Sequence, residues 1–333
     1  MPANKKLQEY VKNELPYKIL QELYKDSRTS LLAMARKFGV SNHTVEVALK
    51  ELESKYGLAY VLQLDEKKLG LVEGKIITIK FDEQPDLGKL KESLQKDVYV
   101  QDAYFSQGDF DLIMYVTGLE SEDFNRWQFS LRKRLFEYGP RFSLFSIWTL
   151  QLGFLPIRNE IIADSTELNS LEKKILMLLN ENSRIKMKEL VKRAKTTQTK
   201  AIYVIRKLKE KGIIKRFSTL VQNPEKRLYM AYGTSHMPSM EHDKLLLQYL
   251  KLIVSEDLHK ASNDYALIID GVGSYDALYI CDFSKSEDAQ KSGPEVLKTL
   301  WAHQHLKVEK AILTDLIVGK WPFHLESYEL QHK

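Results

Sequence analysis

An internal repeat is the feature that most constrains how this chain can fold. The same order of apolar, turn and charged residues is present in residues 28–57 and in residues 184–212. Matching positions are separated by 156 residues, beginning with the pair Leu15 and Leu171. One extra residue in the first copy precedes its final glycine, Gly57. The 333 residues therefore predict one structural unit that is present twice.

Each copy begins with the pattern of a winged helix-turn-helix. In the first copy, apolar residues at helical spacing predict helices over 15–24 and 31–38. A third helix is expected to open at Ser41, a favoured N-cap residue, and to end at Gly57, after which a short β-wing follows. The second copy predicts matching helices at 171–179, 187–193 and 197–211, and a wing at 213–221.

The rest of each copy changes to alternating strands and helices in the order β-α-β-β-α-β, which is typical of a ferredoxin-like domain. The fold class is therefore predicted as α+β, with two winged helix-turn-helix domains alternating with two ferredoxin-like domains. In the second copy the two helices of this part are expected at 243–253 and 295–302. The predicted domains are 1–63, 64–157, 158–220 and 221–333, the last with a C-terminal tail, and 156–166 is the expected link between the copies.

Composition places the chain among ordinary globular proteins, with 44% hydrophobic and 29% charged residues. No apolar run approaches the roughly 20 residues that a membrane helix needs, and the N-terminus lacks the apolar core of a secretory signal. A single cysteine, Cys281, excludes an internal disulfide and fits a reducing compartment, so a cytoplasmic location is expected. The net charge of +5 lies entirely in residues 161–333, which carry 27 basic residues against 22 acidic ones.

Several short motifs carry a resemblance to a known family. They are the GVS..TVE.AL..LE run that opens at Gly39, the KLKEKGIIKR junction that opens at Lys207, and the GDFD and GSYD corners at 108–111 and 273–276. With the order of the elements, they make the chain resemble the leucine-responsive/asparagine (Lrp/AsnC) family of prokaryotic transcription regulators. That resemblance implies sequence-specific binding to double-stranded DNA, cytoplasmic location and effector domains that pair between subunits. One chain here holds both halves, so either an internal pseudo-dimer or a homo-oligomer is expected.

A helix-turn-helix reads bases with the N-terminal part of its third helix. In the second copy the predicted base-reading residues are Thr197, Gln198, Thr199, Lys200 and Tyr203, and Arg206 and Lys207 are expected to contact phosphates. In the first copy the predicted base-reading residues are Ser41, Asn42, His43 and Thr44. Arg28, Arg36 and Lys37 are expected near phosphates in the first copy. Residues 197–211 carry five basic residues against one acidic residue, whereas 42–55 carry two against three. The second copy is therefore expected to be the stronger reader. The alternative is a solvated basic helix face.

By the same resemblance, a small amino-acid-like effector is expected at the two glycine corners. The candidate residues are Gly108, Asp109, Asp111, Gly273, Ser274 and Asp276. Glycine lets a ligand approach the backbone, and aspartate can hold an ammonium group. The competing interpretation is that these residues simply suit hairpin corners.

Catalytic motifs are absent, since the chain has no phosphate-binding glycine loop, zinc-protease helix or nucleophile elbow. We therefore expect no enzyme, no cofactor and no metal site, although His303 and His305 are close together. Cys281, Trp127, Trp148 and Trp301 are expected in the core. Two alternatives stay open. The sirohaem decarboxylases share this architecture by resemblance, although the His- and Arg-rich strand expected for a tetrapyrrole is not evident, and a protein that partners other regulators without touching DNA fits as well.

Overall fold

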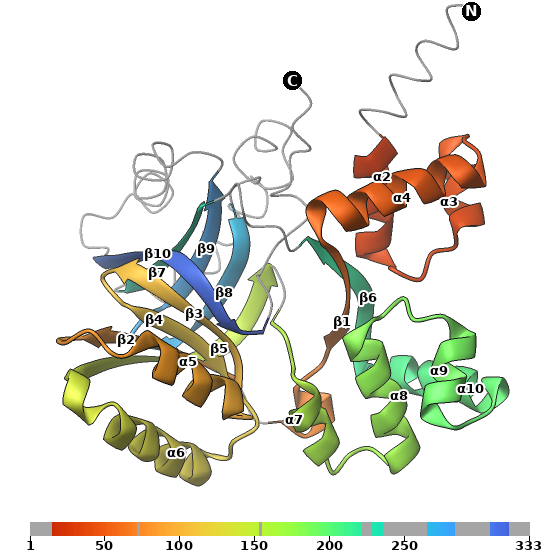
Figure 1. The fold of residues 1–333 in the computed structure, drawn as a ribbon. Helices are drawn as coiled ribbons and strands as arrows, with labels where there is room; N and C mark the ends of the chain where they lie inside the picture. Colours follow the sequence, from red (N-terminus) through yellow and green to blue (C-terminus); the bar gives the residue numbers. More distant parts are fainter. Residues whose placement is uncertain are drawn as a thin grey trace, which may run out of the picture. The chain divides into compact units, whose positions relative to one another are not determined.

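The computed structural model describes residues 15–71, 74–152, 155–221, 228–235, 265–283 and 307–319. They form two compact units, and each unit combines a segment of the first copy with a segment of the second (Figure 1). The first unit comprises the described residues of Met1–Gly70 and Ile162–Asn223, and the second those of Leu71–Ile161 and Pro224–Ser327. The chain is α+β, as expected from the sequence.

The first unit contains both helix-turn-helix motifs. The first copy supplies α2 (Leu15–Lys25), α3 (Leu31–Phe38) and α4 (Asn42–Tyr56), and the second supplies α8 (Ser170–Glu181), α9 (Met187–Ala194) and α10 (Gln198–Glu210). Local signals define these helices. The Ser41 hydroxyl accepts a hydrogen bond from the Thr44 amide at 3.0 Å, and Thr197 caps α10 in the same way. Leu15, Ile19, Leu20 and Leu23 lie on one face of α2 and are fully buried. The predicted helices are confirmed.

The predicted β-wing of each copy pairs with the wing of the other copy and not with a second strand of its own copy. β1 (Leu58–Leu64) and β6 (Ile214–Val221) are single strands, and they pair antiparallel with each other from Leu58 opposite Val221 onwards. The strand of each copy is thus completed by the other copy. In Figure 1, α2 to α4 lie above this ribbon and α8 to α10 below it.

A polar contact joins the two motifs beside the ribbon. Ser27 and Ser183 are matching residues, both fully buried, and their hydroxyl oxygens lie 2.6 Å apart. The guanidinium of Arg28 donates to the Ser183 carbonyl at 2.8 Å, and the guanidinium of Arg184 donates to the carbonyls of Ser27 and Thr29. We call these four residues, Ser27, Arg28, Ser183 and Arg184, the Ser-Arg clasp. It satisfies buried polar groups of each copy with groups of the other.

The link between the copies is partly helical. Within the expected linker 156–166, the structure has the short helix α7 (Asn159–Asp164). Arg158, just before it, donates to the carbonyls of Asp97 and Val100 in the second unit. Six residues are too few for helical periodicity to be read from sequence, which is why this element was missed.

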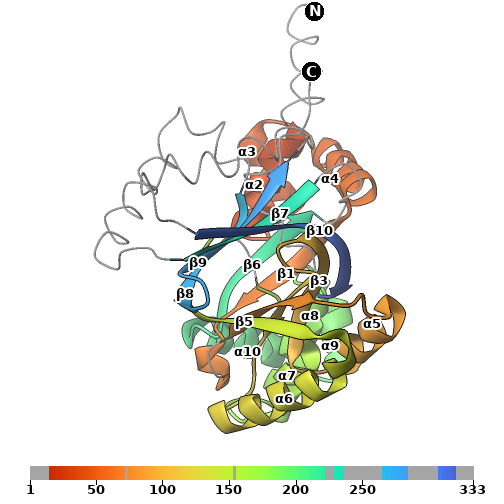
Figure 2. The same ribbon diagram turned by 90° about the vertical axis from the view of Figure 1, so that its left-hand side faces the viewer.

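The second unit is a closed barrel of eight strands. The first copy supplies β2 (Lys75–Phe81), β3 (Val100–Gly108), β4 (Leu112–Val116) and β5 (Pro140–Leu152), and the second supplies β7 (Leu228–Ser235), β8 (Tyr265–Gly273), β9 (Ala277–Phe283) and β10 (Lys307–Val318). The order is β10-β3-β4-β2-β5-β8-β9-β7, so each copy has the ferredoxin-like strand order. β10, which crosses the view in Figure 2, pairs with β3 of the first copy, and β5 pairs with β8 of the second.

Alternating residues of the strands build two cores in this unit. The interior of the barrel is shared by both copies and includes Ile76, Phe110, Phe145, Tyr275 and Leu278. The outer face of the first copy packs under α5 (Leu87–Lys96) and α6 (Ser121–Arg134). Trp127 is buried there, as predicted. The side chains of Trp148 and Cys281, the residue Trp301 and the expected helices at 243–253 and 295–302 lie outside the described part of the chain.

The turns before α4 and α10 differ at the residue that adopts a left-handed conformation. Gly39 has a φ of 67°, and its counterpart Lys195 has a φ of 53°, a left-handed conformation that costs a side-chain-bearing residue roughly 1–2 kcal/mol. A Cβ at Gly39 meets nothing within 4 Å, so only the backbone conformation matters at this turn.

The difference predicts a matched pair of stability changes. Lys195→Gly is expected to raise the free energy of unfolding by about 0.5–1 kcal/mol, because relief of left-handed strain outweighs the added freedom of the unfolded chain. Gly39→Ala is expected to lower it by about the same amount. Urea unfolding of both variants checks this. A loss of stability in Lys195→Gly would contradict the account.

Candidate nucleic-acid interface and ligand pocket

The N-terminal edge of α10 presents the residues that the sequence singled out. Thr197, Gln198, Thr199 and Lys200 are exposed, and Tyr203, one turn further on, is 55% exposed. Lys200 makes no ion pair with any residue in the described ranges. The helix therefore carries amide, hydroxyl, ammonium and phenol groups on one solvent-facing edge.

The two residues expected on phosphates have different surroundings. The Arg206 side chain is exposed and lies 3.6 Å from Glu210, one turn along the same helix. The Lys207 ammonium instead contacts the carboxylate of Glu172 at 2.6 Å, and Glu172 is only 3% exposed. Lys207 thus holds α10 against α8, a contact between distant helices that the sequence does not reveal.

Glu172 belongs to a buried polar cluster at the start of α8. One carboxylate oxygen accepts from Lys207 and the other accepts from the Asn169 amide at 3.0 Å, which completes a capping box. Burial alone raises a carboxyl pKa, but hydrogen bonds from Lys207 and Asn169 outweigh it and hold the pKa of Glu172 below its ordinary value.

The matching edge of α4 is less basic. Ser41, Asn42 and His43 are exposed and Thr44 is half-buried. Next along the helix, the Glu46 carboxylate lies 2.9 Å from Lys50, whose hydrogen bond lowers the pKa of Glu46 and keeps it ionised. A carboxylate therefore stands on the edge that would face DNA.

Arg28 does not lie at a phosphate-binding edge, contrary to the expectation. It belongs to the Ser-Arg clasp, and its guanidinium stacks over the Phe217 ring at 5.5 Å from the centroid. Arg36 and Lys37 are exposed, and Lys37 pairs with Glu22. The Ser-Arg dipeptide is present in both copies. This repetition is the feature of the sequence that indicates a contact between the two copies.

The first glycine corner closes the barrel. The Asp109 amide donates to the Lys310 carbonyl at 2.8 Å, and the Lys310 amide donates to the Asp109 carboxylate at 2.8 Å. Gly108 has a φ of 148°, and a Cβ there would lie 2.4 Å from the Lys310 carbonyl oxygen. Glycine is therefore required here because β10 of the other copy approaches so closely.

The second corner repeats this geometry against the first copy. The Ser274 amide donates to the Leu144 carbonyl at 2.8 Å, and the Leu144 amide donates to the Ser274 hydroxyl at 3.1 Å. A Cβ at Gly273, where φ is 138°, would lie 2.3 Å from the same carbonyl oxygen. Contact with a strand of the other copy therefore explains both glycines.

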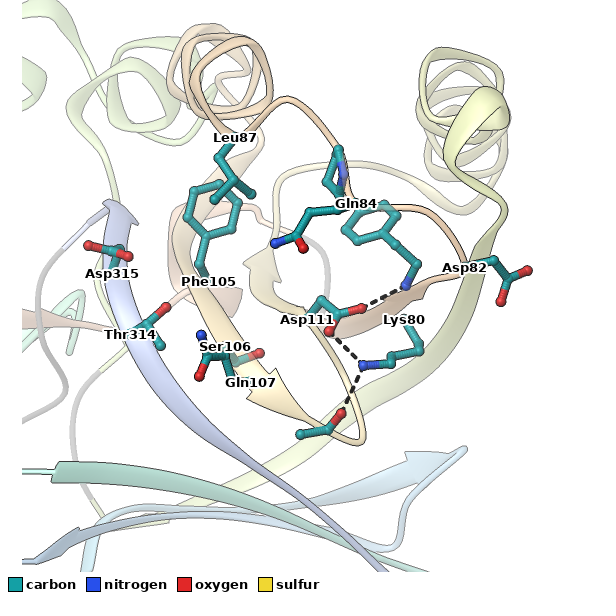
Figure 3. Close-up of a pocket in the computed structure, with 13 residues that line it drawn as sticks. Lys80, Asp82, Gln84, Leu87, Phe105, Ser106, Gln107, Asp111, Thr314 and Asp315 are labelled. Atoms are coloured by element: carbon teal, nitrogen blue, oxygen red, sulfur yellow. Dashed lines mark hydrogen bonds and ion pairs between the residues drawn. The ribbon is translucent and has the colours of Figure 1, made fainter. Parts of the chain in front are cut away.

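A cavity of about 470 Å³ lies beside the first corner (Figure 3). The Lys80 ammonium, at its wall, lies 2.7 Å from the Asp111 carboxylate and 2.9 Å from the Gly108 carbonyl oxygen. The second oxygen of Asp111 accepts from the Phe81 amide at 2.8 Å. The cavity is lined by both apolar and polar residues. They include the apolar Pro85, Leu87 and Phe105 and the polar Gln84, Ser106, Gln107, Thr314 and Asp315.

Lys80 was not predicted as a site residue, although it is the one charged residue within the strand segment IITIKF. The registers of β2 on β4 and of β7 on β9 make Ser235 its counterpart in the second copy. Asp276, the counterpart of Asp111, thus has no lysine at the matching position. The two corners are alike in backbone and different in charge.

Polar groups also meet at a second cavity, of about 360 Å³, which is lined by Lys80, Arg141 and Glu309 among others. Beside it, the buried Tyr275 hydroxyl lies 2.9 Å from the Thr78 hydroxyl and donates to Glu309 at 2.6 Å. Burial and the Glu309 carboxylate raise the pKa of Tyr275 above its usual value, so its hydroxyl keeps its proton. Groups from both copies thus meet at this cavity.

In the part of the chain that the structure describes, no three His, Cys, Asp or Glu side chains gather as a metal site. Among the same residues, no helix is both long and apolar enough to cross a bilayer. His303 and His305 lie outside these ranges.

The two helix-turn-helix motifs are similar to those of known DNA-binding proteins. A family model described as winged helix-turn-helix DNA-binding matches residues 12–55 and 168–215. The transcriptional regulator LrpA of Pyrococcus horikoshii is 32% identical over 108 residues, which are 32% of this chain and 74% of LrpA. The chain belongs to the Lrp/AsnC family. The regulatory protein AsnC of Haemophilus influenzae is 31% identical over 105 residues, 31% of this chain and 70% of AsnC.

A solved structure matches this family member over nearly its whole length. The sirohaem decarboxylase NirDL covers 94% of this chain and 96% of its own, with a TM-score of 0.61 and 15% identity. This likeness establishes a shared fold. It also contradicts the expectation that the chain is not an enzyme, because a protein of the same whole-chain fold is one.

The Glu172 cluster predicts a dependence of stability on pH. Because the pKa of Glu172 is lower in the folded state, its contribution to the free energy of unfolding is complete well above the ordinary carboxyl pKa and is lost as the pH falls through the lower, folded-state pKa. In chemical unfolding below pH 4.5, wild type is expected to lose stability faster than Glu172→Gln. Identical pH profiles would remove Glu172 as the cause.

Proposed function

We propose that this chain regulates transcription by binding double-stranded DNA through its two helix-turn-helix motifs, used as a preassembled pair. The observation that carries the proposal is the joining of both motifs in one unit by the β1–β6 ribbon and the Ser-Arg clasp, with the N-terminal edges of α4 and α10 exposed. Helix-turn-helix dimers bind DNA with two such edges in successive major grooves. Membership of the Lrp/AsnC family supports the same function.

The chemistry of α10 suits sequence reading. Gln198 can form two hydrogen bonds with adenine, and Lys200 can donate to the acceptors of guanine. Arg206 and the exposed lysines of α9, Lys188 and Lys192, supply charge for phosphates. Lys207 is left out of this set because Glu172 holds it.

We infer that the cavity beside Lys80 binds a small amino-acid-like effector. Lys80 offers a cation for a carboxylate, and Asp111 and Asp315 offer carboxylates for an ammonium group. Phe105 and Leu87 offer apolar surface for a side chain. Binding would exchange the Lys80–Asp111 ion pair for two pairs with the ligand, in a corner that also contacts β10 of the other copy.

A second candidate function is chemistry on a tetrapyrrole. The observation that favours it is the whole-chain fold shared with NirDL, which has also been solved in complex with an iron-uroporphyrin III analogue. Such a ligand carries several carboxylates, and the cavities at the barrel offer Lys80 and Arg141 as cations.

Charge reversal on α10 tests the DNA proposal. Lys200→Glu with Arg206→Glu is expected to lower affinity for DNA at least about 10-fold at low salt and to flatten its salt dependence, since cationic contacts are lost. Fluorescence anisotropy across a salt series, with upstream DNA and random fragments, measures this. The matched control is Lys91→Glu with Lys133→Glu, two exposed lysines of the barrel unit.

Equal affinity of the α10 variant and wild type would overturn the assignment of α10. No binding by wild type, even at low salt, would leave the protein as a partner of other regulators or an enzyme. Both variants keep Lys207, so the contact with Glu172 stays intact and the comparison does not measure unfolding.

Thermal shift measurements test the ligand. One of the twenty amino acids is expected to raise the Tm of wild type and of the control Lys91→Met, and to have no effect on Lys80→Met. The same proteins are titrated with iron-uroporphyrin III and followed by absorbance. Tetrapyrrole binding without any amino-acid response would replace the effector proposal by the second candidate.

A further inference from the structure

We propose that this chain recognises an asymmetric DNA site, in which α10 reads a half-site of defined sequence and α4 holds the other half with little sequence preference. The inference rests on the proposed DNA binding and concerns what kind of site is bound. It names the second copy as the source of specificity.

The scaffold fixes two reading helices in equivalent positions. Matching residues of the two motifs are 156 apart, and the Ser-Arg clasp uses matching residues of both copies at its centre. A dimer of identical subunits on such a scaffold reads a palindrome with half-sites about 10 base pairs apart. In this chain the scaffold repeats and the reading residues do not.

The electrostatic difference between the motifs is large. Residues 186–211 carry ten basic residues against two acidic ones, a net charge of +8, whereas the matching 30–55 carry four against three, a net of +1. Lys188 replaces Leu32, which is 47% exposed, and Lys195 replaces Gly39. The phosphate backbone is therefore held mainly by the second copy.

The reading positions differ in reach as well as in charge. Lys200 extends into solvent, whereas its counterpart Thr44 is half-buried and its hydroxyl lies 2.8 Å from that of Ser41. The counterpart of Tyr203 in α4 is Val47, whose side chain has no polar group. At a third position α10 has Ile202, and α4 has the carboxylate of Glu46, which repels phosphates and the acceptor edges of guanine.

Selection of sites from a random DNA library, with the full chain, tests the inference. The expected motif has one conserved half-site, while footprinting shows protection over two successive major grooves. An inverted repeat with two equally conserved halves would overturn the asymmetry and leave the proposed function intact. Failure to select any DNA would overturn both, so the two failures are distinguishable.

Matched substitutions give a second measurement. On the selected site, Gln198→Ala is expected to lower affinity about 5- to 100-fold, the range for loss of a good base contact. The counterpart Asn42→Ala is expected to change it less than about 3-fold. Equal losses would overturn the inference.

A symmetrised chain completes the test. Asn42→Gln, His43→Thr, Thr44→Lys and Val47→Tyr give α4 the reading residues of α10, and Ser41 still caps the helix. This variant is expected to select an inverted repeat of the half-site that wild type selects. An unchanged, single half-site would show that residues other than these set specificity, against the inference. Circular dichroism confirms that the variant is folded before selection.

Discussion

Unsatisfied strand edges are the constraint on which the rest of this structure depends. A four-stranded ferredoxin-like sheet has two edges whose amides and carbonyls need partners, and exposed edges invite pairing with other chains. Here β5 pairs with β8 and β10 pairs with β3, so each copy completes the other and the barrel has no edge. The β1–β6 ribbon solves the same problem for the helix-turn-helix unit.

The closely approaching strands explain the glycines at the corners. Gly108 and Gly273 sit where a strand of the other copy passes too near for any Cβ, and the residues after them, Asp109 and Ser274, bond to that strand. The contacts of each corner therefore close the barrel, whether or not a ligand binds beside it. Any ligand beside Lys80 would bind against a joint between the copies, which connects the cavity to the packing of both halves.

Sequence reasoning succeeded where the determinants are local. The cap Ser41, the apolar face of α2 and the helix that starts near Thr197 depend on residues close together in the sequence, and they were predicted. It failed for contacts between distant segments. Neither the pairing of the wings nor the contact of Lys207 with Glu172 leaves a pattern within a short window, since a basic residue on an exposed helix looks the same in either role.

The site was predicted in part for the same reason. The exposed edge of α10 follows from helical position alone, whereas Arg28 was misplaced because its partners, Ser183 and Phe217, belong to the other copy. Lys80 was missed because the register that brings it to Asp111 is set by the sheet.

The joining of both halves in one polypeptide has a consequence for regulation. Subunits on separate chains associate at a rate and extent that depend on their concentration, but two halves on one chain meet at an effective concentration set by the linker. The assembly described here is therefore insensitive to dilution. Pairing within one chain also competes with pairing to related proteins, so each half can diverge in sequence with less formation of mixed pairs.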